Sequence, residues 1–226
     1  GQVGAVRAAQ YIANVYKQPP LPPEAFMKEV GGQAASLHRE FASTLDASEN
    51  AVDLDTIRPA IQERMSRSAA FVRSLEGVKQ ALAEAKDLYR QITTRGIACP
   101  ARQALARAAE DKLLALTSIA FLEAMCYYIE HGGGSRGGYM VLDDDGDLGV
   151  DTRHGSVLRH RSENEEKRSE ILEVFPNTVK PGDFTVKPVT VRPLPQDESW
   201  YETVWADWEK GSIFSGPPGR DQNADS

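Results

Sequence analysis

The sequence predicts a mostly α-helical protein: a C-terminal bundle of three to four antiparallel helices, a small irregular β appendage and a short terminal helix. Apolar residues recur at three- and four-residue steps through most of residues 3–131, which is the period of amphipathic helices. Proline and glycine interrupt these segments at short intervals, which favours antiparallel neighbours in a bundle. From Gly138 onward the period changes to that of extended segments.

Composition and charge narrow the possible functions. The chain has 226 residues, enough for one domain or one domain with appendages, and a formal net charge of −7. It has no basic cluster that would indicate nucleic acid and no uninterrupted run of roughly 18 apolar residues that would predict a membrane span. Cys99 and Cys126 are far apart, so we expect free thiols in a reducing, cytoplasmic compartment. The oligomeric state is not indicated.

The first predicted helix covers residues 3–16 and stops at Pro19-Pro20. Its apolar side is formed by Val3, Val6, Ala9, Ile12 and Val15. The helix begins at once, without a capping residue, and this suggests that a longer chain precedes it. We therefore expect the side that carries Val6 and Ile12 to be poorly covered.

A second helix is predicted after the proline-rich break at residues 19–23. Its apolar residues, which we expect to form one buried stripe, are Phe26, Val30, Ala34, Leu37, Phe41 and Leu45. Gly31-Gly32 lies in its middle and costs about 1 kcal/mol per glycine relative to alanine. Such a pair is tolerable where another backbone packs close.

Three further helices follow a polar connector over residues 46–55. The residues expected at their boundaries are Thr56 as a cap, Pro59 in a first turn, Ser74 as a cap, Gly96 as a stop, Pro100 at the start of the longest helix and Gly132 at its end. The last of these helices is predicted to span roughly residues 100–131.

The remaining sequence predicts the β appendage and the terminal helix. Residues 139–142 and 148–150 are expected to pair as a hairpin around Asp145-Gly146. A calcium loop does not fit the acidic run 143–147, because Gly146 in the sixth place puts the first ligand on Val141 and the twelfth on Thr152. Extended segments near 171–174 and 184–191 follow. Pro188 predicts that the second of these is an edge strand, because proline cannot donate a backbone hydrogen bond to a neighbouring strand. Ser199 is expected to cap a short helix with Trp200, Trp205 and Trp208, which packs on its own domain or binds a partner.

One arginine stands out among candidate functional residues. Arg136 lies in a glycine-rich loop after Ser135 and before Gly137. Either its guanidinium satisfies carbonyl groups at a structural corner, or it is a cation at the edge of an active site. No two histidines have the spacing of metal ligands, and His154 and His160 lie in a charged, extended segment that indicates no function for them. The sequence also indicates no Ser/His/Asp or Cys/His catalytic set.

Three passages together resemble the C-terminal part of FAD-dependent flavoproteins of the succinate dehydrogenase, fumarate reductase and aspartate oxidase superfamily. They are residues 1–13, residues 61–82 and the Ser135-Arg136-Gly137 passage, where the family typically has Glu-Ser-Arg-Gly. Two features depart from that pattern. Gly134 stands in place of the glutamate, and the downstream histidine of the dehydrogenases is replaced near Tyr139. A different branch of oxidoreductases is therefore more plausible than a succinate dehydrogenase.

The resemblance implies that FAD is bound mainly by residues upstream of this chain, which itself holds no catalytic residue and has no turnover alone. It implies that the helix start at Gly1, Gln2, Val3 and Gly4 faces the flavin, and that Ser135, Arg136 and Gly137 lie at the edge of the site. The implied partner is an upstream FAD-binding domain or chain. Two alternatives remain: a free-standing helical interaction module, and a non-catalytic subunit of a split flavoprotein.

This interpretation divides the chain into five parts. Residues 1–17 would close a truncated FAD-binding domain, and 18–53 would form a helix and linker. Residues 54–137 would form the C-terminal helical bundle, 138–214 the appendage with the tryptophan helix, and 215–226 a disordered tail.

Overall fold

The computed structural model describes residues 2–15, 19–45, 50–99, 101–153, 155–191 and 200–212. Over these residues the chain is mostly α-helical, as predicted. It divides into two units, residues 1–34 with 192–226 and residues 35–191, and each is described by itself. The expected tail 215–226 and the expected cap Ser199 lie outside the described residues.

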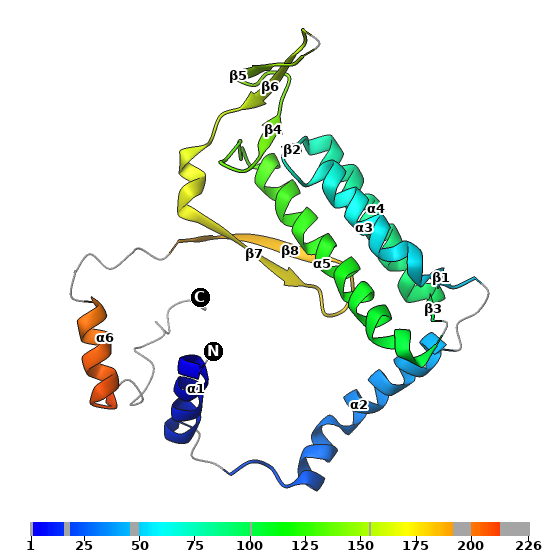
Figure 1. Cartoon of the computed structure of the whole chain (residues 1–226), viewed down its shortest axis with the longest axis vertical. Helices are drawn as coiled ribbons and strands as arrows, with labels where there is room; N and C mark the ends of the chain where they lie inside the picture. The colour runs from blue at the N-terminus through cyan, green and yellow to red at the C-terminus, as the bar shows by residue number, and fades with distance from the viewer. Residues whose placement is uncertain are drawn as a thin grey trace. The chain divides into compact units, whose positions relative to one another are not determined.

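The first unit contains α1 (Gln2–Val15), the beginning of α2 (Pro23–Leu45) and α6 (Trp200–Glu209) (Figure 1). In α1, Val6 is 53% and Ile12 57% exposed, which confirms the expected poor cover of that side. In α6, the rings of Trp205 and Trp208 lie 5.2 Å apart.

The predicted buried stripe of the second helix is wrong. Phe26 is 52% and Leu37 55% exposed, whereas the side chains of Phe41 and Leu45 lie outside the described residues. A Cβ placed at Gly31 or Gly32 meets nothing within 4 Å, so the expected close backbone is absent from the described part of the chain. The apolar period of α2 therefore marks a surface face rather than a core face.

In the second unit, α3 (Leu54–Ser68), α4 (Leu75–Arg95) and α5 (Leu105–Glu130) pack against one another. Figure 1 shows α5 beside α3 and α4 along most of its length. The side chains at the centre of the core include Ile57, Val78, Ala81, Ala85, Ala115, Ile119, Leu122, Ile129 and Val141. By length and composition alone, Arg102–Glu130 could cross a membrane, since an 18-residue stretch within it has a mean hydropathy of 1.4. Its buried face forms much of the core.

Both ends of α4 follow the predicted chemistry, whereas the start of α3 does not. Asp53, not Thr56, caps α3: its Oδ1 accepts from Asp55 N at 3.0 Å. The Thr56 hydroxyl instead donates to the Asp53 carbonyl at 2.7 Å, so Thr56 belongs to the first turn. Ser74 caps α4 as predicted, with Oγ accepting from Gly77 N at 3.1 Å. Gly96 ends α4 as predicted, with φ of 76°.

The other expected helix boundaries are partly right. Pro59 lies inside α3, beyond its first turn. The longest helix begins at Leu105 rather than Pro100, after a 3₁₀ turn over Arg102–Ala104. It ends one residue before His131, and Gly132 follows with φ of 82°, the backbone conformation that glycine adopts most easily.

A four-stranded sheet joins the helices to the segment beyond residue 138. It contains β2 (Val72–Arg73), β4 (Met140–Leu142), β5 (Leu148–Asp151) and β6 (Val157–Arg161) in the order β2-β4-β6-β5. The pair β2–β4 is parallel, and the other pairs are antiparallel. Because β2 lies between α3 and α4 in the chain, helices and sheet share one unit.

The predicted hairpin between residues 139–142 and 148–150 is wrong. β4 and β5 do not pair with each other, because β6 lies between them and pairs with both, so that His160 faces Leu142 on one side and Leu148 on the other. The Asp-Gly turn does form, since Gly146 N donates to Asp143 O at 2.9 Å. However, Gly146 lies against β6: a Cβ there would be 2.4 Å from the His160 carbonyl carbon.

Two small sheets complete the second unit. A 3₁₀ turn over Glu165–Ser169 leads into β7 (Glu170–Pro176), which pairs with β8 (Phe184–Thr190) and packs on α5. Pro188 lies opposite Leu172 in a two-stranded sheet, where every strand is an edge, as its proline predicted. The strands β1 (Val52–Asp53) and β3 (Ile97–Ala98) form a short parallel pair.

Candidate functional site

The loop after α5 is held close to its neighbours by Gly133 and Gly134. A Cβ at Gly134 would be 1.7 Å from the Ser162 carbonyl oxygen, and one at Gly133 would be 2.4 Å from the ring of Tyr128. The expectation that glycines permit close backbone approach is therefore confirmed at these two positions. Gly137 and Gly138 differ, because a Cβ at either meets nothing within 4 Å.

Ser135 connects this loop to both strands beside it. Its Oγ accepts from Val141 N at 3.0 Å and donates to the Arg161 carbonyl at 2.5 Å. The same oxygen lies 3.1 Å from Nδ1 of His160. Because the single hydroxyl proton is given to the carbonyl, this network assigns the imidazole proton to Nδ1, which donates to Ser135.

His160 is one of the site residues that the sequence analysis missed. Its side chain is buried, and its Nε2 has no hydrogen-bond partner among the described residues. The signal was available only through β6: residues 157–161 read Val-Leu-Arg-His-Arg, a charged stretch that does not look like a central strand. Once β6 is placed between β4 and β5, His160 comes to the loop of Ser135.

Arg136 has an exposed side chain, and its donors are not used up by carbonyl groups. Its backbone forms a tight turn with Tyr139, with N to O distances of 3.1 and 2.8 Å. Its Nε pairs with Glu163 Oε1 at 3.0 Å, and its side chain is 43% exposed. Nη1 and Nη2 have no hydrogen-bond partner in the described part of the chain. The guanidinium therefore pairs with a carboxylate and does not satisfy carbonyl groups at this corner.

Glu163 fixes the Arg136 guanidinium and is itself fixed by a second arginine. Arg168 donates to both carboxylate oxygens of Glu163, at 2.9 and 2.6 Å. The hydrogen bond from Arg168, with a smaller contribution from Arg136, lowers the pKa of Glu163, so this carboxylate stays charged at neutral pH. The sequence analysis had not connected residues 163 and 168 with the loop.

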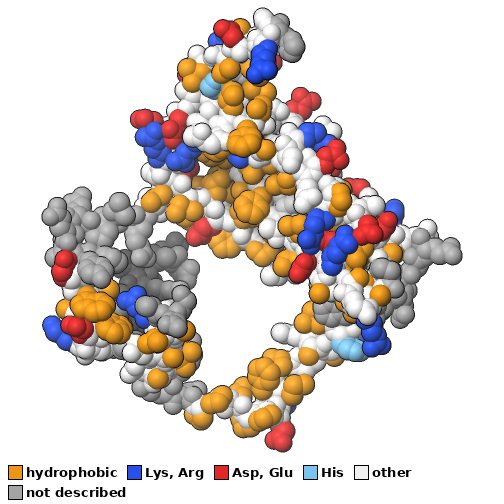
Figure 2. All heavy atoms as spheres, in the orientation of Figure 1, with side chains coloured by type: hydrophobic (Ala, Val, Ile, Leu, Met, Phe, Trp, Pro, Cys, Tyr) orange, Lys and Arg blue, Asp and Glu red, His pale blue; other side chains and the backbone are white. Residues whose placement is uncertain are grey.

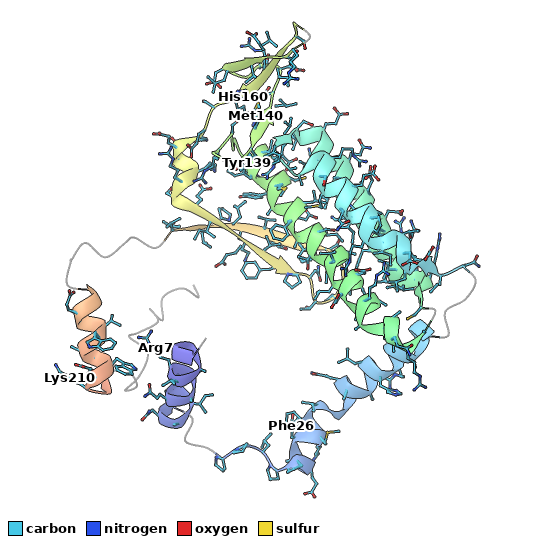
Figure 3. All side chains as sticks on the ribbon, in the orientation of Figure 1. Arg7, Phe26, Tyr139, Met140, His160 and Lys210 are labelled. Atoms are coloured by element: carbon cyan, nitrogen blue, oxygen red, sulfur yellow. The ribbon has the colours of Figure 1, made fainter. Side chains whose placement is uncertain are left out.

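These residues line a pocket of about 450 Å³ between the loop and the four-stranded sheet. The lining residues are Phe71, Val72, Ser135, Arg136, Gly137, Gly138, Tyr139, Met140, Leu148, His160, Ser162 and Glu163. Figure 3 shows the labelled Tyr139, Met140 and His160 gathered where the sheet meets the end of α5. Ser135, Arg136 and Gly137, which the resemblance to the flavoproteins implies at a site edge, line this one pocket.

Tyr139 separates this pocket from a second hollow of about 180 Å³, which Arg73, Tyr128 and Leu172 help to line. The Arg73 guanidinium carbon lies 3.9 Å above the centre of the Tyr139 ring, and Arg73 Nε donates to Ala70 O at 2.9 Å. Burial raises the pKa of Tyr139 to about 12, so its hydroxyl is neutral at physiological pH. Tyr139 therefore acts as a wall.

The other predicted residues lie elsewhere. Gly1 is outside the described residues, as are the side chains of Gln2 and Val3, and Gly4 lies in the first turn of α1. Cys99 and Cys126 are free thiols, as expected. Over the described residues, no group of three or more histidine, cysteine, aspartate or glutamate side chains gathers as a metal site.

Comparison with known proteins identifies no family for this chain. No protein-family model matches the chain, and no curated protein matches it.

Proposed function

We propose that this chain is the C-terminal region of an FAD-dependent oxidoreductase of the fumarate reductase and succinate dehydrogenase type. In this proposal α3, α4 and α5 are the helical bundle that buttresses an FAD-binding domain, and the chain has no turnover by itself. The observation that carries the proposal is Arg136 at the rim of a pocket. Its Nε is paired with Glu163 and its Nη groups have no partner among the described residues. This is the passage in which the sequence resembles the flavoproteins.

The chain's own contributions follow from its residues. Arg136 would hold a negative charge at the site edge, while Ser135 keeps His160 in one orientation. FAD, when bound, would supply the hydride transfer, and the residues that bind most of it would lie upstream. A cytoplasmic location belongs to the same proposal.

The start of α1 fits the flavin contact that the resemblance implies. Its first turn carries no acidic residue, and a Cβ at Gly4 meets nothing within 4 Å. The first N–H groups of a helix are free donors at the positive end of its dipole, which suits a phosphate or an electron-rich ring edge. Gln2, Val3 and Gly4 would meet FAD through backbone rather than side chains.

The coding sequence immediately upstream of Gly1 tests this proposal. We expect several hundred in-frame codons that contain a strand, a GxGxxG turn and a helix. We also expect the polypeptide purified from its natural source to show a flavin absorbance spectrum, and the 226-residue chain alone to retain no flavin after it is incubated with FAD and the unbound FAD is removed by gel filtration. An upstream region without a dinucleotide fold, or a flavin-free natural protein, would refute it.

A second candidate is an interaction module or the non-catalytic subunit of a split flavoprotein. The exposed apolar side chains of α1 and α2 favour it, because such surfaces are usually covered by a partner. They include Val6, Ile12, Phe26, Met27 and Leu37, each more than half exposed. A start codon directly before Gly1, together with co-purification of a separate FAD-binding chain, would favour the split flavoprotein.

A further inference from the structure

We infer that the pocket beside Arg136 binds an amphiphilic monoanion, a single carboxylate carried on an aryl or branched apolar body. This inference rests on the proposed function only in using the same pocket, and it requires no flavin. It goes beyond that function by naming the ligand class. The argument depends on one oriented cation, on the lack of a second one, and on apolar walls that folding leaves exposed.

The cation is oriented for a carboxylate. Arg136 Nε pairs with Glu163 Oε1 at 3.0 Å, which fixes the guanidinium and leaves Nη1 and Nη2 without a hydrogen-bond partner among the described residues. Arg168 takes both oxygens of Glu163 and also contacts the exposed Glu165 at 3.4 Å. Glu163 is thus shared between two arginines and only partly neutralises Arg136. A planar guanidinium with two free donors binds a carboxylate by paired hydrogen bonds.

The pocket has a single positively charged side chain in its lining. Of its lining residues, Arg136 alone is an arginine or lysine. The Ser135 hydroxyl already donates to Arg161 O, and the Nδ1 proton of His160 points to Ser135. A second carboxylate on the ligand would therefore lack a cationic partner in the lining and would be repelled by the negative charge of Glu163. This argues against a short dicarboxylate.

The rest of the wall is apolar and unusually exposed. Phe71 is 76%, Val72 43% and Leu148 45% exposed, and Met140 lies beside them in the lining. Figure 2 shows hydrophobic side chains gathered over this part of the second unit. A ligand body that covers these side chains removes their surface from water, which is favourable in proportion to the area covered. A cavity of about 450 Å³ lies in the usual range for small-molecule sites.

The loop that carries Arg136 leaves the pocket beside it open at Gly138. Gly133 and Gly134 are pressed against neighbouring atoms, whereas a Cβ at Gly138 meets nothing within 4 Å. Gly138 lines the pocket, so a large side chain at this position would occupy space that a ligand needs. Packing alone does not explain a glycine here, and the substitution Gly138→Leu tests whether the space is used.

The test titrates the 226-residue chain with phenylacetate and follows binding by calorimetry and by amide NMR shifts. Acetate lacks the apolar body, phenylacetamide lacks the charge, and succinate carries two charges without an apolar body. We expect phenylacetate to bind at least about tenfold more tightly than each of these. The largest shifts should fall on the amides of Arg136, Gly137, Gly138 and Met140.

Variants locate the site. We expect Arg136→Gln to weaken phenylacetate binding by about 10- to 100-fold, the usual loss for a charged hydrogen-bonding group. Gly138→Leu should weaken it by about tenfold or more by filling the pocket. The matched control is Arg95→Gln, an equal loss of charge on the last turn of α4. That position lies about 30 Å along the helix from its start at Leu75, so we expect no change beyond about twofold.

Several results would overturn the inference. They are binding of succinate as tight as that of phenylacetate, equal binding of phenylacetamide, equal losses in Arg136→Gln and Arg95→Gln, or no binding of phenylacetate at all. Should Arg136→Gln unfold the protein, Gly138→Leu still decides the question. The proposed function fails separately: a natural polypeptide without flavin that binds phenylacetate refutes the flavoprotein and supports this site.

Discussion

Ser135→Ala should destabilise the protein because it removes the acceptor of a buried backbone group. Val141 is fully buried, and its N–H donates to Ser135 Oγ at 3.0 Å. The Arg161 carbonyl would keep a partner, since Ser135 N donates to it at 3.2 Å. The Nδ1 proton of His160 could shift to the same carbonyl at 3.3 Å. The variant therefore loses the two hydrogen bonds that the Ser135 hydroxyl makes with Val141 N–H and the Arg161 carbonyl, at a net cost of about 0.5–1.5 kcal/mol each.

Urea unfolding followed by circular dichroism measures this loss as a change in the free energy of unfolding. The matched control is Ser66→Ala on α3, an exposed helical serine, for which we expect a change within about 0.5 kcal/mol. A loss below about 0.5 kcal/mol in Ser135→Ala would show that Val141 N–H finds another acceptor, and the account of Ser135 as a connecting residue would be wrong.

Three further predictions concern other contacts. Asp111 is fully buried and accepts a hydrogen bond from Arg58 Nε at 2.6 Å, so Asp111→Ala should lower the midpoint of urea unfolding. The control is Glu110→Gln, because Glu110 is exposed and also contacts Arg58; its free energy of unfolding should change by no more than about 0.5 kcal/mol. An equal effect would contradict a structural role for the buried Asp111 carboxylate and its contact with the exposed Arg58. Gly134→Ala should reduce the melting temperature strongly, because its Cβ would be 1.7 Å from Ser162 O, whereas Gly138→Ala should not. Burial raises the pKa of Cys126 to about 11, so iodoacetamide should label Cys99 first at neutral pH; equal rates would refute the buried thiol. Because the folded state holds that proton more tightly than the unfolded chain, this contribution to stability is lost as pH rises from about 9 to about 11.

The helical part of the fold could be predicted because its signals are local. Ser74 and Gly96 mark the two ends of α4 through groups within three or four residues of each boundary. Thr56 misled because Asp53, three residues earlier, offers a carboxylate as the cap. The stripe of α2 misled for another reason: an apolar period shows which face a helix could bury, but not whether a neighbour exists to cover it.

The sheet and half of the site could not be predicted, because their partners are distant in sequence. β2 has only two residues, too few for a recognisable pattern. β6 contains charged residues, which are not typical of a central strand, so the sequence does not indicate its place in the sheet. Without β6 the sequence favours a β4–β5 hairpin and leaves His160 without a role. The loop of Ser135, Arg136 and Gly137 was found by its composition, whereas Glu163, which fixes Arg136, becomes recognisable only in three dimensions.

The parallel pairing of β2 with β4 sets the order in which this pocket can assemble. It joins Val72 to Met140, which are 68 residues apart (140 − 72), with α4 and α5 between them. Closing so long a loop costs chain entropy before the strands gain their contacts, so this pairing should form after α4 and α5 have docked. The two apolar walls, Val72 and Met140, meet only then. A molecule that occupies the pocket would therefore bind the finished fold and no partly folded form. It would add RT ln(1 + [L]/Kd), where [L] is its free concentration, to the protection of those core amides that exchange through global unfolding.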